Sequence, residues 1–229
     1  MRKSGWIGPF LFILVLACSD TTPPTTTPSP ATTIAAPPST AAVTTSAPSD
    51  LPVAPWASAA PLSAVDVPVL AAEWEQAENQ TTCAALTPSG GIAGATPRGA
   101  NFSGGWAVAW DATDGPGMAA DGTFCEDCGR SAVGVAGAGV AAVESDVRAW
   151  PNVMEWNDGS LAGYGIEGSI TGAVDDAATT SGDSATQLAF LSVAGQECLY
   201  NVWSRRSEVE LLDVIGRLRF VEGLGSPDG

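Results

Sequence analysis

TQLAFLSVAGQECLYNVW, at residues 186–203, contains two strand-like runs joined by the short link AGQ at 194–196. Apolar and aromatic residues dominate both runs, as is typical of strands that are at least half buried. A glycine-containing link between two such runs predicts an antiparallel hairpin. The second run places Cys198, Tyr200 and Val202 on one face, because successive side chains of a strand point to opposite faces.

The stretch that follows, SEVELLDVIGRLRFV at residues 207–221, predicts a helix and then a short strand. Ser207 and Glu210 match a capping box, in which the serine accepts the Glu210 amide and the glutamate reaches back to the Ser207 amide. Arg219–Val221 is expected to form a short closing strand. Apolar residues recur along the helix and predict a broad stripe that packs on a sheet: Val209, Leu211, Leu212, Val214, Ile215 and Leu218.

Upstream segments predict the remaining elements. Asp66 is expected to cap a helix that has Pro68 in its first turn and ends near Thr82. Strands are expected at 106–110 and 133–143, and a hairpin at 153–156 and 161–166 around the Asp-Gly turn at 158–159. Together these elements predict an α+β fold: a single domain with a mainly antiparallel sheet of about five to seven strands and one or two helices packed on one face.

The N-terminus has the features of an export signal. Arg2 and Lys3 give a positive start, and the apolar run 7–16 is too short to span ~30 Å of hydrocarbon as a helix. The run ends in VLAC at 15–18, which resembles the lipobox of bacterial lipoproteins over the first 20 or so residues. The resemblance implies a signal peptide at 1–17, and a diacylglycerol on the Cys18 sulfur with an acylated amino group, such as a palmitate amide.

A linker and one domain are expected after the lipidation site. Residues 18–62 are, after the cysteine, almost wholly Thr, Pro, Ser and Ala, so they cannot build a core. The repeated prolines favour an extended tether, which at ~3.1 Å for each of ~40 residues would reach about 120 Å when fully stretched. The globular domain is predicted at 63–229, which is the size of a single domain.

The charge balance and the missing histidine narrow the function classes. The chain has 9 basic and 25 acidic residues, for a formal net charge of −16, and it contains no histidine. Such a charge disfavours nucleic acid, because that contact depends on Lys and Arg neutralising phosphate. The absence of histidine removes the usual general base and the commonest metal ligand. No nucleic-acid partner, cofactor or metal is therefore expected.

Four cysteines remain once Cys18 is assigned to the lipid. An even number in an exported chain predicts two disulfides, for which three connectivities exist. The preferred pairing joins Cys125 to Cys128 locally and Cys83 to Cys198 across the domain. Either of the other pairings would require the tight loop at 125–128 to contact two distant elements at once.

FCEDCG, at 124–129, allows three interpretations. A thioredoxin-like redox pair needs a helix after the first cysteine to lower the thiol pKa, but a glycine-rich segment follows, and Glu126 and Asp127 oppose a thiolate. A zinc knuckle would need Cys83 and Cys198 as further ligands, and neither lies in a second CxxC. A structural disulfide between Cys125 and Cys128 is the favoured interpretation.

Two further groups of residues are candidate binding sites. The acidic segment within 111–127 could hold calcium, but it lacks the alternating ligand spacing of an EF-hand, so a solvated acidic loop is favoured. Tryptophan offers a flat apolar face and one hydrogen-bond donor, which suits a sugar or peptide, although tryptophan on a strand is more often core. The candidate ligand groove consists of Trp106, Trp110, Trp156 and Trp203.

The sequence therefore predicts an acidic lipoprotein anchored to a bacterial membrane and facing the periplasm or the exterior. Its domain is expected to be a non-enzymatic binding or interaction module for a small ligand, a cell-wall component or an envelope protein, with no catalytic residues assigned. The alternative is a thiol–disulfide redox protein that uses Cys125 and Cys128. A hydrolase that relies on carboxylates remains open, although no paired acidic motif argues for it.

Overall fold

The computed structural model describes residues 50–100, 102, 104–167 and 186–225, which all belong to one compact unit, Ser46–Gly229. Several predictions fall outside these residues: the signal peptide at 1–17, the lipidated Cys18 and the linker as far as residue 49.

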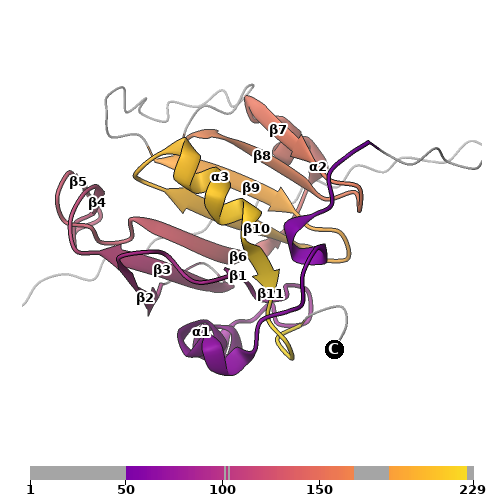
Figure 1. The fold of residues 1–229 in the computed structure, drawn as a ribbon, viewed down its shortest axis with the longest axis horizontal. Coiled ribbons are helices and arrows are strands. Elements are labelled where there is room, and N and C mark those ends of the chain that lie inside the picture. Colours follow the sequence, from indigo (N-terminus) through magenta and orange to yellow (C-terminus); the bar gives the residue numbers. More distant parts are fainter. Residues whose placement is uncertain (1–49, 101, 103, 168–185, 226–229) are drawn as a thin grey trace, which may run out of the picture. The chain divides into compact units, whose positions relative to one another are not determined.

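Seven antiparallel strands form the main sheet, which confirms the predicted α+β class (Figure 1). Both predicted hairpins are present, as the pairs β7–β8 and β9–β10. In spatial order the strands are β2 (Ala95–Gly99), β3 (Trp106–Ala112), β6 (Val133–Ala141), β10 (Cys198–Ser204), β9 (Gln187–Ser192), β8 (Leu161–Ile166) and β7 (Asn152–Glu155).

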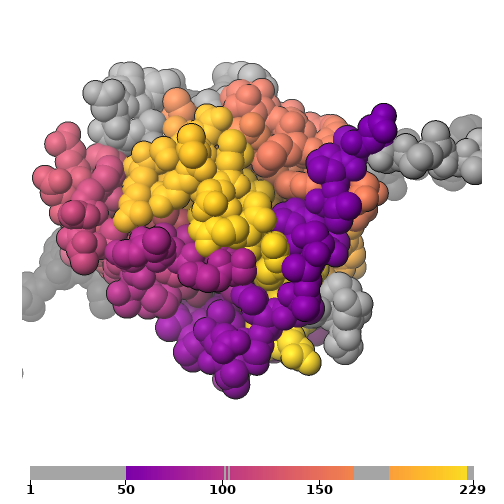
Figure 2. Space-filling model, in the orientation of Figure 1, coloured from indigo at the N-terminus to yellow at the C-terminus, as the bar shows by residue number. Residues whose placement is uncertain are grey.

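Helices cover both faces of the sheet. α1 (Pro68–Gln76) and α3 (Glu208–Gly216) pack on one face, where α3 lies over β9 and β10 and occupies the middle of the view (Figures 1 and 2). α2 (Glu144–Arg148) packs on the other face through Val147. The predicted helices on one face are therefore α1 and α3, whereas the short helix α2 on the opposite face was not predicted.

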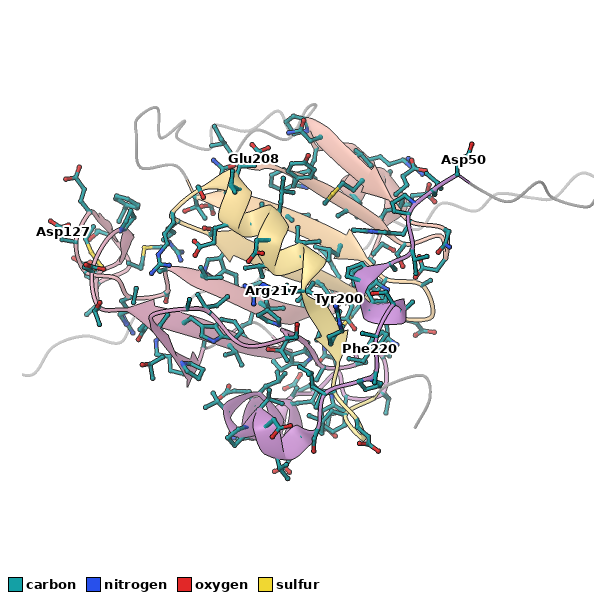
Figure 3. All side chains as sticks on the ribbon, in the orientation of Figure 1. Asp50, Asp127, Tyr200, Glu208, Arg217 and Phe220 are labelled. Carbon is teal, nitrogen blue, oxygen red and sulfur yellow. A yellow bond between two sulfur atoms is a disulfide. The ribbon has the colours of Figure 1, made fainter. Side chains whose placement is uncertain are left out.

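Two small ribbons flank the main sheet. β11 (Leu218–Phe220) is the predicted closing strand, but it pairs with β1 (Leu86–Pro88) and not with the main sheet. β4 (Gly117–Met118) and β5 (Phe124–Cys125) form a hairpin inside the segment that was expected to be a loop. This hairpin projects from one end of the sheet, where Asp127, two residues after β5, lies at the left edge of the view (Figure 3).

The N-terminus of α3 confirms half of the predicted capping box. The Ser207 hydroxyl accepts the Glu210 amide at 3.1 Å. The side chain of Glu210 does not reach back to the Ser207 amide; it accepts from the Ser204 hydroxyl at 2.8 Å and from Arg206 at 2.9 Å. The Ser207 amide donates instead to Ser204 Oγ. The predicted apolar stripe is buried at its centre, but Val209 at its start is 78% exposed.

The core lies between the sheet and the helices α1 and α3, and Tyr200, labelled in Figure 3, is fully buried in it. The Tyr200 hydroxyl donates to the Ala84 carbonyl at 2.9 Å, and its ring meets Trp106 edge-on at 6.1 Å between centroids. Burial raises the pKa of Tyr200 above its usual range. The predicted Cys83–Cys198 disulfide lies in the same core and joins the segment after α1 to β10.

Three predicted boundaries are corrected. α1 ends at Gln76, six residues before the predicted end near Thr82. Asp66 does not cap α1, because it ends a short 3-10 helix, η2 (Ala64–Asp66), and Val67 is the N-cap residue without a side-chain bond. The folded part of the chain also begins before residue 63. Trp56, in the 3-10 helix η1 (Pro55–Ala57), is buried in the core, and the Leu62 amide donates to the Phe220 carbonyl at 2.8 Å. The burial of Trp56 and the backbone hydrogen bond of Leu62 thus make the last residues of the proline-rich segment part of the domain.

Candidate functional site

Small residues line the sheet face opposite α3. In β3 and β6 the large side chains belong to the core beneath α3, and the positions between them hold only alanine or glycine. Because neighbouring residues of a strand point to opposite faces, these small residues gather on the face away from α3. They are Ala107, Ala109, Gly134, Ala136 and Ala138.

Trp203 lies on this face next to the small residues. In the strand register it sits between Gly134 of β6 and Leu188 of β9. A Cβ atom at position 134 would overlap the indole ring, so glycine there allows Trp203 to lie directly against β6. The indole Nε1 donates to the Ser131 carbonyl at 3.2 Å, which fixes the orientation of the ring.

Asn201 is the neighbouring residue of β10 on the same face. It sits between Ala136 and Phe190, and only 6% of its surface is exposed. Its side chain makes no hydrogen bond to the part of the chain that the structure describes. Asn201 therefore presents a polar amide on a face that otherwise carries small and aromatic side chains.

A cavity of about 550 Å³ lies above these residues. Its apolar wall consists of side chains from four separate segments, and Phe190 is braced from behind by Trp150 with ring centroids 5.1 Å apart. The hairpin β4–β5 contributes one rim. The apolar lining residues are Ala100, Phe102, Met118, Ala119, Ala120, Leu188, Phe190 and Trp203, and the polar and charged ones include Arg98, Arg130, Ser131, Glu167, Asn201 and Arg205.

Ser131 organises the charged end of the cavity. Its amide donates to Asp111 Oδ1 at 2.7 Å, its hydroxyl accepts from Arg98, and its carbonyl accepts from both Trp203 and Arg205. Ser131 has φ of 52°, the left-handed conformation that non-glycine residues seldom adopt. Such strain persists only where surrounding contacts hold it, and it concentrates at functional sites.

The arginines at this end are not equally neutralised. Arg98 forms a salt bridge with Asp111 at 2.8 Å. Arg205 is partly buried, its Nε has no hydrogen-bond partner, and neither Arg205 nor Arg130 takes part in a salt bridge within the described residues. Burial lowers the pKa of Arg205, and the charge of Glu167 acts in the opposite direction. The described lining residues therefore carry an excess of positive charge in a strongly acidic protein.

The four tryptophans of the predicted groove do not come together. Trp106 and Trp110 point into the core side, because they share the parity of Val108 on β3. Trp110 also lines a second cavity of about 390 Å³ beside α1. Trp156 packs edge-on against Trp56 at 5.0 Å between centroids. Trp203 alone among the four lines the larger cavity.

The Cys125–Cys128 disulfide is present at the end of the β4–β5 hairpin, with Cys128 exposed. Gly129 continues the chain in a left-handed turn toward β6, so neither cysteine stands at a helix N-terminus. That arrangement lacks the helix dipole that lowers the thiol pKa in a thioredoxin-like centre. The bridge instead closes the hairpin whose β4 side forms a rim of the cavity.

The acidic segment uses two of its carboxylates in internal contacts. Asp111 binds Arg98 and Ser131, and the Asp121 carboxylate accepts from the hydroxyl and amide of Thr123. The hydroxyl bond is the main reason that the pKa of Asp121 is lowered. Within the described ranges, no three His, Cys, Asp or Glu side chains gather closely enough to hold a metal ion. None of the helices found there has the length and apolar character to cross a membrane.

Sequence reasoning missed most of this site. Asn201, Arg205, Arg98 and Glu167 were not predicted, because they lie up to about a hundred residues apart and only the strand register brings them together. One signal was available. In the sequence of β3, tryptophan and valine alternate with alanine, which indicates one face with large side chains and one face free for a ligand.

No protein-family model matches this chain, and neither the curated proteins nor the solved structures contain a significant match to it.

Proposed function

We propose that this protein is a non-enzymatic binding module, anchored to a bacterial membrane through a lipid on Cys18, which takes a small ligand into the cavity of about 550 Å³. The observation that carries the proposal is the lining of this cavity: apolar side chains from four separate segments surround the amide of Asn201 and a charged end at Ser131. Ligand sites are mostly apolar concavities with a few convergent polar groups, which is the composition of this lining.

Binding explains the lining better than catalysis does. Glu167 is the single carboxylate among the described lining residues, and the chain has no histidine to act as a base. The Ser131 hydroxyl accepts a hydrogen bond from Arg98, and among the described residues it has no hydrogen bond to a group that could act as a general base. Apolar walls, a fixed indole ring and an amide can bind a molecule of complementary shape and polarity, and they need no catalytic group to do so.

Blocking the cavity is expected to abolish ligand binding. Ala100 lies at its edge, and Ala100→Trp would place an indole in the space that the ligand needs. Neutral 1-naphthylacetamide is a suitable probe, because a molecule of its size is expected to bind with Kd of about 1 mM, within reach of saturation-transfer NMR. We expect the wild-type protein to bind it and Ala100→Trp to bind at least ~10-fold more weakly.

Ala93→Trp is the matched control, since Ala93 is exposed in a turn outside the cavity. It should bind the probe like the wild type. Equal binding by the Ala100→Trp variant, or no binding by a folded wild-type protein, would contradict the proposed cavity function.

Replacing Cys18 with alanine is expected to move the protein out of the membrane fraction. The lipobox resemblance assigns the lipid to the Cys18 sulfur, and burial of each acyl methylene is worth ~0.8 kcal/mol, so losing the lipid removes most of the membrane affinity. Fractionation of cells that express the full chain, with mass spectrometry of its N-terminus, measures this. Membrane retention of Cys18→Ala together with an unacylated wild-type N-terminus would refute the anchor.

A further inference from the structure

The charged end of the cavity indicates which class of ligand it takes. Arg98 is neutralised by its salt bridge with Asp111. Of the remaining charges among the described lining residues, Arg130 and Arg205 are positive and Glu167 is negative, which leaves one positive charge in excess. A ligand with a single negative charge would balance the site.

Arg205 is the residue best placed to receive that charge. One of its terminal nitrogens, Nη1, is fixed by the Ser131 carbonyl, so the orientation of the guanidinium is set before any ligand arrives. Its Nε is buried without a partner, so Nη2 is the nitrogen that can donate into the cavity. Nη2 makes no hydrogen bond to described residues, and the group forms no salt bridge with them. A guanidinium with this donor free matches a carboxylate, because hydrogen bonds between two charged groups are the stronger ones.

The rest of the lining requires an apolar body on the same ligand. Trp203 is the penultimate residue of β10 and lies two residues before Arg205. Its ring is held flat against Gly134. Leu188 and Phe190 continue the apolar floor on β9. An indole face next to a guanidinium suits a flat apolar group that carries an anionic substituent, with Asn201 available for a hydrogen bond.

We propose that the cavity binds a small organic carboxylate with a flat apolar body, and that Arg205 is the residue that binds its carboxylate. The inference rests on the proposed binding function and adds the ligand class to it. A phosphate ester is disfavoured, because its charge of about −1.5 to −2 exceeds the single positive charge in the lining.

The test compares two probes that differ in charge and hardly in shape. 1-Naphthylacetate carries a carboxylate where 1-naphthylacetamide carries a neutral amide. We expect the purified wild-type protein to bind the carboxylate ~10- to 100-fold more tightly than the amide, as measured by saturation-transfer NMR against a detergent blank, because hydrogen bonds to charged groups are the stronger ones. A third probe, 1-naphthyl phosphate, should bind no more tightly than the carboxylate.

Variants assign the effect to Arg205. Arg205→Met keeps the length of the side chain and should reduce the preference for carboxylate over amide to less than ~3-fold, and Arg205→Lys should restore part of it. Arg206→Met is the matched control, because Arg206 pairs with Glu210 and does not line the cavity. Arg130→Met, at an exposed position, provides a second test if Arg205→Met does not fold, and should weaken carboxylate binding alone.

The outcomes separate this inference from the function on which it rests. If the wild-type protein binds amide and carboxylate equally, or if Arg205→Met keeps the full preference, the ligand class is wrong while the binding function stands. Tighter binding of the phosphate would likewise overturn the carboxylate. If the folded protein binds none of the probes, both proposals fail.

Discussion

Replacing Cys83 and Cys198 together by alanine is expected to lower the free energy of unfolding by about 5 kcal/mol. The bridge joins residues 115 positions apart, and closing so long a loop removes a large amount of conformational entropy from the unfolded chain. Both cysteines are at most 2% exposed, so alanine avoids the burial of a new polar group. Urea denaturation of the purified protein measures the loss.

The second disulfide provides the control within the same chain. Cys125 and Cys128 are three positions apart, and the same reasoning gives an expected loss of about 2 kcal/mol for the double alanine variant. A loss of similar size for both bridges would show that loop closure does not govern the contribution of Cys83–Cys198. The long bridge also lies in the core with Tyr200, whereas the short one lies at an exposed hairpin. Loss of the long bridge should therefore lower the free energy of unfolding more than loss of the short one.

Sequence patterns were reliable where structure depends on neighbouring residues. The hairpins β7–β8 and β9–β10 and the serine cap of α3 follow from local turn and capping chemistry, and all are present. Predictions that needed a distant partner fared less well. β11 forms where it was expected, but its apolar residues do not specify that β1 is the strand with which it pairs.

The candidate site shows the same limit more clearly. The alternation in β3 predicts that Trp106 and Trp110 share a face, but it does not state that α1 and α3 cover that face. The opposite, small-residue face carries the cavity, and its charged residues come from β2, from the turn before Ser131, from the end of β8 and from the chain after β10. Their meeting depends on the order β2-β3-β6-β10, which only the folded structure supplies.

Gly163→Ala is expected to destabilise the protein by about 2–3 kcal/mol, because α2 approaches β8 too closely for a side chain. A Cβ atom at position 163 would overlap the carbonyl oxygen of Val147 and crowd Trp150. The obstacle is backbone, which cannot turn aside as a flexible side chain could, and overpacking of this kind costs ~1–3 kcal/mol. The helix would have to move off the sheet, although Val147 is fully buried there.

Gly216→Ala is the matched control. Gly216 is the last residue of α3, and a Cβ atom there meets nothing within 4 Å, so the same substitution should raise stability by ~0.4–1 kcal/mol through the lower entropy of the unfolded chain. Urea denaturation of both variants should therefore give shifts of opposite sign. A neutral Gly163→Ala variant would show that the contact between α2 and β8 is not close.

The Gly163 variant also connects stability to the site. Trp150 packs edge-on against Phe190, which lines the cavity, so displacing α2 removes the support behind one of its walls. We therefore expect folded Gly163→Ala protein to bind 1-naphthylacetamide ~3- to 10-fold more weakly, since loss of an aromatic contact costs about 0.5–1.5 kcal/mol. Gly216→Ala should bind it normally. Unchanged binding in a destabilised Gly163→Ala variant would show that Phe190 holds its position without Trp150, and that β9 alone supports this wall of the cavity.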